Sequence, residues 1–238
     1  MSHLHFTYDA LERQYRSVLD LGYEFVSCQG FVDRKKRLPD LTVVNRVDID
    51  VSVRKAERLL HIFDRLKVPA TFFVRLHAAE YNPFSFEHYR ILKAIRDSGH
   101  EIGYHSEIVD QAAIWDENAA DCLKRDIDVL NRMLGIHVRG VASHGGMTGL
   151  NNLDFWRNRT PAEFGLSYEA YDKLDAFGLF DTSFYVSDSE WTRWKCYDRG
   201  VLRDGDRRSF EEHARDLHPL IYLLIHPDTY FDRHCYES

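Results

Sequence analysis

Residues 41–50 read LTVVNRVDID, an apolar run that ends on two acids separated by a single residue. A short apolar run that leads into a helical pattern is typical of a buried strand in a parallel sheet. Because side chains alternate along a strand, Asp48 and Asp50 should lie on the same side of it. Both carboxylates can then converge on one point beyond the strand end, a geometry that suits a cation.

Strand and helix patterns alternate from this run onward. Further strands are expected at residues 70–74, 101–104, 138–142 and 220–225, and helices through residues 53–63, 86–95 and 119–134. This order predicts an α/β fold with a parallel sheet in a single domain, residues 1–238. Residues 145–210 are loop-like and are expected to form loops around the site. Residues 1–40 are expected to form a helix over residues 8–21 and then an extended stretch, together covering one end of the sheet.

Charge and composition exclude several classes of function. The net charge is -7 and the Lys and Arg residues are scattered, so a nucleic-acid partner is not expected. No stretch approaches the roughly 20 apolar residues of a membrane span, and the N-terminus does not resemble a signal peptide. The four cysteines are far apart in the sequence, which predicts free thiols in a cytoplasmic protein.

Acids and histidines recur where the predicted strands end. Asp48 and Asp50 close the first strand, and His105, His144 and His226 each follow another one. In parallel sheets and barrels the carboxyl ends of the strands form the site. One carboxylate with two imidazoles would hold zinc or a similar divalent ion and leave a position open for water. The second carboxylate is then free to act as a base.

Each of these residues also has an ordinary structural interpretation. A histidine after a strand is often a surface residue, and Asp48 could cap a helix or pair with Arg46. Glu107 could be a metal ligand or a partner that orients an imidazole. Trp194 could stack on a sugar ring or fill the core. The acids of residues 119–134 are expected on a solvated helix face.

The motifs together resemble the polysaccharide deacetylase family, carbohydrate esterases with a NodB-type domain, over residues 41–228. The interval from Asp50 to an Ala-Thr-Phe-Phe strand at residues 70–73 is similar to the family's, as is Gly-His-Glu-Ile at 99–102 followed by His105. An apolar strand that ends in His226 completes the likeness. The resemblance implies a distorted (β/α) barrel of about seven parallel strands, a divalent metal, and hydrolysis of an N-acetyl group from an amino sugar.

The resemblance also implies roles for single residues. Asp50 and His105 would bind the metal, Asp48 would be the base, and His226 the general acid. The family's two acids are adjacent, whereas Ile49 separates them here, and Val109 stands where the family places a further ligand. The candidate for that ligand is His144, with Glu107 and Asp110 behind it. Arg139 would orient the base.

Residues 143–188 resemble a subgroup described as surface-polysaccharide deacetylases. This resemblance implies an acetylated sugar from O-antigen or capsule assembly. Glu169, Asp188 and Trp194 are the candidate substrate-binding residues. Two other functions stay open at this point. One is a carbohydrate-binding relative without catalysis, and the other is a glycosyltransferase in which Asp48-Ile49-Asp50 binds a nucleotide sugar through a divalent ion. The sequence does not fix the sugar, the metal or the oligomeric state.

Overall fold

The computed structural model describes residues 5–234 and 236, whose strands form one sheet in the order β6-β5-β4-β3-β2-β10-β7-β8-β9. The strands on this path are β2 (Thr42–Ile49), β3 (Thr71–Val74), β4 (Glu101–Ser106), β5 (Gly140–Ser143), β6 (Tyr168–Glu169), β7 (Phe184–Ser187), β8 (Lys195–Asp198), β9 (Val201–Leu202) and β10 (Leu220–Ile225). The seven strands from β6 to β7 pair in parallel, and β8 and β9 continue the sheet in antiparallel pairs. The predicted α/β class with a parallel sheet is therefore confirmed.

The parallel row curves into an incomplete barrel. No ladder joins β6 to β7 among the described residues, but the two ends of the row approach each other through aromatic side chains. The hydroxyl oxygens of Tyr171 and Tyr185 lie 3.2 Å apart, and Tyr222 donates from its hydroxyl to the carbonyl of Ala170 at 3.1 Å. A buried cluster that includes Phe73 fills the space between them.

The alternation of β2 divides its side chains between two faces. Val43, Val47 and Ile49 face outward into the large core, which they share with the surrounding helices. Val44 faces the barrel interior. Residues 46, 48 and 50 have the same parity as Val44, so the acids point to the inside, as the sequence predicted.

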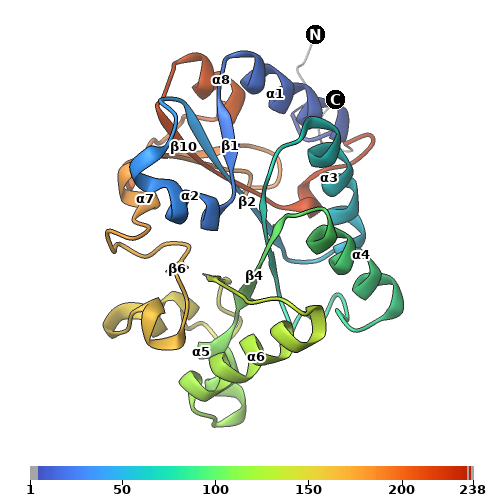
Figure 1. Cartoon of the computed structure of the whole chain (residues 1–238), viewed down its shortest axis with the longest axis vertical. Coiled ribbons are helices and arrows are strands. Elements are labelled where there is room, and N and C mark those ends of the chain that lie inside the picture. Colours follow the sequence, from blue (N-terminus) through green and yellow to red (C-terminus); the bar gives the residue numbers. More distant parts are fainter. Residues whose placement is uncertain (1–4, 235, 237–238) are drawn as a thin grey trace.

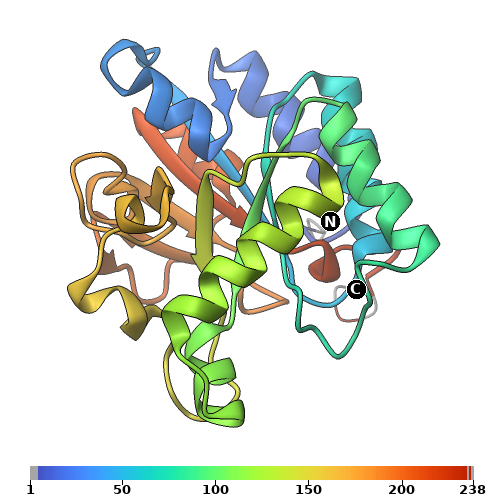
Figure 2. The same ribbon diagram turned by 60° about the horizontal axis from the view of Figure 1, so that its bottom comes forward.

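The helices pack on the outside of the sheet. They are α1 (Tyr8–Asp20), α3 (Val53–Leu66), α4 (Phe86–Asp97), α6 (Ala119–Leu134) and α8 (Phe210–Arg215), and α3 and α4 lie side by side in both views (Figures 1 and 2). Ser52 caps α3, because its hydroxyl accepts a hydrogen bond from the backbone N–H of Lys55 at 3.3 Å. Among the described residues, no helix is both long enough and apolar enough to cross a membrane.

The N-terminal segment does more than cover the sheet. The helix α1 forms as predicted, but the expected extended stretch contains β1 (Glu24–Val26), α2 (Cys28–Arg34) and the short helix η1 (Lys35–Arg37). β1 pairs in parallel with the start of β2, so this segment is part of the sheet. The prediction was wrong because a three-residue strand is too short to show a period in the sequence.

The expected loops over residues 145–210 also contain regular structure. Besides β6 to β9, this region forms the short helices η2 (Asn152–Asn158), η3 (Pro161–Phe164) and α7 (Leu179–Thr182). Two further helices were not predicted, α5 (Ile108–Trp115) and η4 (Pro227–Thr229). Three of the cysteines, Cys28, Cys122 and Cys196, are buried free thiols, and Cys235 lies outside the described residues.

Candidate metal and catalytic site

The predicted strand-end residues meet at one edge of the sheet. Asp50 follows β2, His144 follows β5 and His226 follows β10, while His105 is the penultimate residue of β4. All four line a cavity of about 400 Å³. A larger groove of about 800 Å³ lies between α1 and α8, but none of these four residues lines it. The chemistry of the smaller cavity therefore identifies it as the candidate site.

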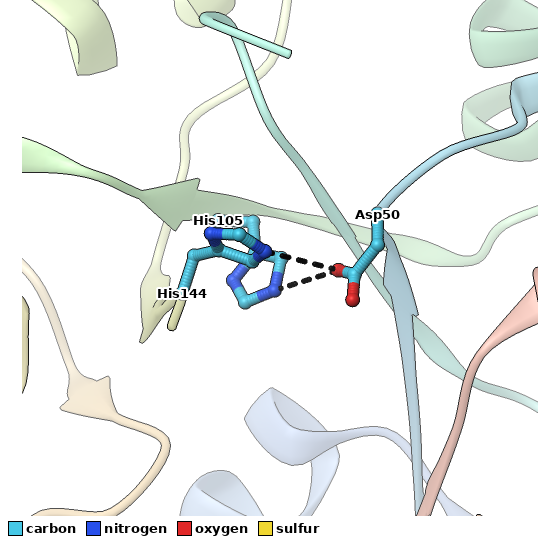
Figure 3. A group of neighbouring side chains, drawn as sticks. All are labelled: Asp50, His105 and His144. Atoms are coloured by element: carbon cyan, nitrogen blue, oxygen red, sulfur yellow. Dashed lines mark ion pairs between the residues drawn. The ribbon is translucent and has the colours of Figure 1, made fainter. Parts of the chain in front are cut away.

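Three of these side chains form a compact donor set. The Nε2 atoms of His105 and His144 lie 3.1 Å and 4.0 Å from the same oxygen of Asp50, Oδ1, and the two rings are nearly perpendicular. Figure 3 shows both rings directing a nitrogen toward this oxygen. Oδ1 is buried and has no well-aligned hydrogen bond from any described residue. One carboxylate and two imidazoles suit zinc or a similar divalent ion, so these residues fit the metal that the motifs imply.

Each imidazole of the donor set faces a second group through its other ring nitrogen, Nδ1. Nδ1 of His105 lies 2.8 Å from the carbonyl oxygen of Ala142, so it carries the proton and leaves Nε2 free as a ligand. Nδ1 of His144 lies 3.4 Å from Oε1 of Glu107. The guanidinium of Arg75 in turn donates to this Glu107 oxygen at 2.7 Å. Glu107 thus lies beside the His144 imidazole, although Nδ1 of His144 has no well-aligned hydrogen bond among the described residues.

Asp48 is held by an arginine of its own strand. Arg46 donates from Nε and Nη2 to the two oxygens of Asp48 at 2.8 Å and 2.7 Å, and both side chains are buried. Burial alone would raise the pKa of Asp48, but the charges of Arg46 and His105 outweigh it and keep the pKa below its usual range. Asp48 Oδ2 also lies 3.3 Å from Nε2 of His105. Asp48 is thus an ionised acid beside the donor set.

The remaining histidine is paired with a buried acid. Nδ1 of His226 lies 2.5 Å from Oδ1 of Asp188, and the backbone N–H of His226 donates to both oxygens of that carboxylate. Burial works to lower the pKa of His226, but the Asp188 carboxylate outweighs it and raises the pKa to about 9. His226 is therefore an imidazolium at neutral pH, with Nε2 lying 3.8 Å from Oδ2 of Asp50.

Comparison with known proteins gives a family match over part of the chain. The model of the polysaccharide deacetylase family matches residues 39–153, which span the strands that carry Asp48, Asp50 and His105. These residues belong to the polysaccharide deacetylase family. Membership indicates a deacetylase, that is a hydrolase, acting on an acetylated polysaccharide.

The chain is also similar to solved structures at low sequence identity. IcaB from Ammonifex degensii is 19% identical, with 68% of this chain and 74% of that chain covered and a TM-score of 0.48. A family 4 carbohydrate esterase from Bacillus anthracis is 18% identical, with coverages of 90% and 76% and a TM-score of 0.48. The polysaccharide deacetylase Bc1974 from Bacillus cereus is 17% identical, with coverages of 79% and 80% and a TM-score of 0.46. No curated protein matches the chain. The family assignment rests on the family model.

The structure corrects the expected orienter of the base. Arg139 precedes β5 on the surface, where its Nε donates to the hydroxyl of Ser167 at 3.1 Å. The guanidinium beside Asp48 comes instead from Arg46. The sequence held this signal, because Arg46 has the same parity as Asp48 and Asp50 along β2.

The three residues expected to bind substrate are buried and contact other parts of the protein. Trp194 is only 1% exposed and packs against the rings of Phe6 and Phe210, so it belongs to the core. Glu169 is buried, accepts hydrogen bonds from backbone N–H groups, and has a pKa raised to about 7 by that burial. Asp188 is fully buried and positions His226. In a deacetylase site, Asp188 therefore acts by positioning the imidazole of His226, not by binding substrate.

Asp110, a lower-ranked candidate for the further ligand, instead holds the loop that follows His144. Its carboxylate accepts hydrogen bonds from the backbone N–H groups of Met147 and Thr148 and from the amide of Asn152. Asn152 also donates to the carbonyl of His144 at 3.1 Å. Asp110 therefore fixes the backbone that carries His144.

The aromatic and cationic wall of the cavity was missed by the sequence reasoning. It lines the same cavity as the donor set and consists of Tyr171, Phe180, Tyr185, Tyr197 and Lys195. The signal was weak, because these residues come from two short strands, from the four-residue helix α7 and from a loop within residues 145–210. A wall of aromatic rings beside polar groups is typical of a ligand pocket.

Proposed function

We propose that the protein is a metal-dependent deacetylase that removes the N-acetyl group from an amino sugar of a surface polysaccharide or of its precursor. The observation that carries the proposal is the convergence of Asp50, His105 and His144 at one point, with Asp48 on one side and His226 on the other. A base, a donor set and an acid are the groups that amide hydrolysis needs.

Asp50, His105 and His144 would hold the metal. When bound there, a divalent ion would polarise the acetyl carbonyl and lower the pKa of a coordinated water. The mixed carboxylate and imidazole donors favour zinc over a hard ion such as Mg²⁺, which prefers an all-oxygen site.

Two residues of the chain would move protons. Asp48, kept ionised by Arg46, accepts a proton from the attacking water at a carboxylate oxygen. His226, kept protonated by Asp188, donates from Nε2 to the departing nitrogen, because its Nδ1 faces the Asp188 carboxylate. Each proton transfer contributes about 10²–10⁴-fold to the rate.

The proposed substrate class follows from the resemblance to surface-polysaccharide deacetylases, which supports a reaction in O-antigen or capsule assembly. The aromatic wall supports a sugar, because aromatic faces pack well against the C–H groups of a pyranose ring. A cytoplasmic location is part of this proposal, since the three described cysteines are free thiols.

The glycosyltransferase alternative is disfavoured by the environment of Asp48. Asp48 pairs with Arg46, and two imidazoles rather than a second carboxylate lie beside Asp50, which does not match an Asp-x-Asp site for a diphosphate-bound ion. A carbohydrate-binding relative without catalysis remains the alternative that the experiment must separate.

Acetate release is the direct test. Purified protein loaded with zinc should release acetate from N-acetylated oligosaccharides, dipicolinate should abolish the activity, and added zinc should restore it. Activity that survives complete removal of the metal would contradict metal dependence. Calorimetric binding of the same oligosaccharides with the metal present, but without any acetate release, would instead support the non-catalytic relative.

A further inference from the structure

One wall of the cavity is built from the paired strands β7 and β8. In their antiparallel register Lys195 lies opposite Ser187, and Tyr197 lies opposite Tyr185. Because Ser187 is the last residue of β7, Lys195 lies at the same carboxyl edge of the sheet as the donor set. Alternation places Lys195 and Tyr197 on one face of β8, and both line the cavity.

The aromatic rings of this wall lie next to one another, and one of them lies beside Lys195. The ring of Phe180 lies 5.2 Å from each of the rings of Tyr185 and Tyr197, and those two rings are 5.8 Å apart. The ammonium of Lys195 lies 5.6 Å from the centre of the Tyr197 ring. A sugar packed on these rings would bring one of its substituents to the Lys195 ammonium.

Lys195 differs from the other charged groups of the cavity in having no opposite charge beside it. Arg46 is matched by Asp48, Asp50 faces the imidazoles, and His226 is matched by Asp188. Among the residues that the structure describes, no acid lies within ion-pair distance of the Lys195 ammonium. An unmatched cation on the wall of a partly closed cavity attracts an anionic ligand.

We propose that Lys195 forms a subsite for a negatively charged group, a carboxylate or a phosphate, on the amino sugar that the enzyme deacetylates. This inference rests on the proposed function and narrows its substrate to an acidic sugar or a phosphorylated precursor. The lysine acts as a point charge, which binds either anion. The cavity, about 400 Å³, has the size of a small-ligand pocket.

The test compares matched ligands on matched variants. The neutral ligand is N-acetylglucosamine, and the anionic ligands are its 6-phosphate, N-acetylglucosaminuronic acid and UDP-N-acetylglucosamine, which separate a monophosphate, a carboxylate and a nucleotide diphosphate. Each is measured for binding by calorimetry and for acetate release with the zinc-loaded wild type, Lys195→Ala and Lys195→Arg. Lys124→Ala serves as control, because Lys124 is an exposed residue of α6.

We expect the wild type to prefer at least one anionic ligand. Lys195→Ala should weaken that binding about tenfold to hundredfold, the usual range for a charged hydrogen bond, while binding of the neutral sugar stays within about twofold. Lys195→Arg should retain most of the preference, and added salt should reduce it in the wild type.

The outcomes separate this inference from the proposed function. A wild type without anion preference, or a Lys195→Ala variant that weakens neutral and anionic ligands equally, would overturn the subsite. An anion preference that disappears in Lys195→Ala, with no acetate released from any ligand, would support the subsite and contradict the deacetylase function. Acetate release from the neutral sugar without any preference for anionic ligands would support the deacetylase function and contradict the subsite.

Discussion

Exchange of Asp48 for asparagine is expected to lower kcat for acetate release by about 10²–10⁴-fold, the usual contribution of a general base. Asparagine is nearly isosteric and keeps one oxygen that can accept from Arg46, but it cannot take up a proton at neutral pH. The donor set of Asp50, His105 and His144 does not include Asp48, so bound metal should stay at the wild-type level. Initial rates and metal content are measured on the same preparation.

The matched control is Asp128→Asn, since Asp128 is an exposed acid that pairs with Arg132 on α6. This variant should retain wild-type kcat. If Asp48→Asn is folded by circular dichroism, contains metal and keeps kcat within a few-fold of wild type, Asp48 only balances the buried charge of Arg46. The separation of the two acids by Ile49 would then mark a lost base.

Replacement of His226 by alanine should also lower kcat by about 10²–10⁴-fold, because the departing amine would leave without a proton donor. The loss should be much smaller for p-nitrophenyl acetate, whose leaving group departs without protonation. Comparing the two substrates with wild type and His226→Ala therefore isolates the proton transfer. Equal losses on both substrates would contradict the role of His226 as an acid.

Asp188→Asn tests how that acid is maintained. The His226 imidazolium is stabilised by Asp188, so activity should fall as the pH rises through the pKa of His226. Removal of the carboxylate lowers this pKa. The alkaline limb of the profile of activity against pH should therefore move to lower pH by about 1–2 units. An unchanged limb would mean that another group controls it.

In parallel sheets the carboxyl ends of the strands form the site, which explains why much of the site could be predicted from the sequence. Asp50, His105, His144 and His226 are far apart in the chain, but each falls at the carboxyl end of a parallel strand with a recognisable apolar pattern. Such strands fix the position of their last residues whatever the intervening loops do. Alternation of side chains along the strand separately predicted that Asp48 and Asp50 lie on the same side.

The partners of these residues were harder to predict, because they depend on tertiary contacts. The parity of Arg46 with Asp48 along β2 favours Arg46 as the partner, but only packing shows that Arg139 lies on the surface. Asp188 was expected to contact substrate. It follows β7, a four-residue strand whose sequence shows no clear period. Short strands have too few residues for alternation to show.

Burial of acids is a second property that sequence periodicity did not reveal. Asp126 of α6 was expected on a solvated face with Asp121 and Asp128, but it is only 3% exposed. Its carboxylate accepts hydrogen bonds from the hydroxyl of Tyr104 at 2.7 Å and from the amide of Gln111 at 2.7 Å. Because Gln111 belongs to α5, a helix that was not predicted, no pattern within α6 could show this partner.

The most direct test of the account is the amount of metal bound by wild type and by Asp50→Ala, measured by plasma mass spectrometry after dialysis against zinc. The wild type and the control Asp128→Ala should each retain about one zinc ion per chain, whereas Asp50→Ala should retain almost none, because Asp50 supplies the only carboxylate of the donor set. An Asp50→Ala variant with wild-type stoichiometry, or a wild type that binds no metal, would contradict the proposed site.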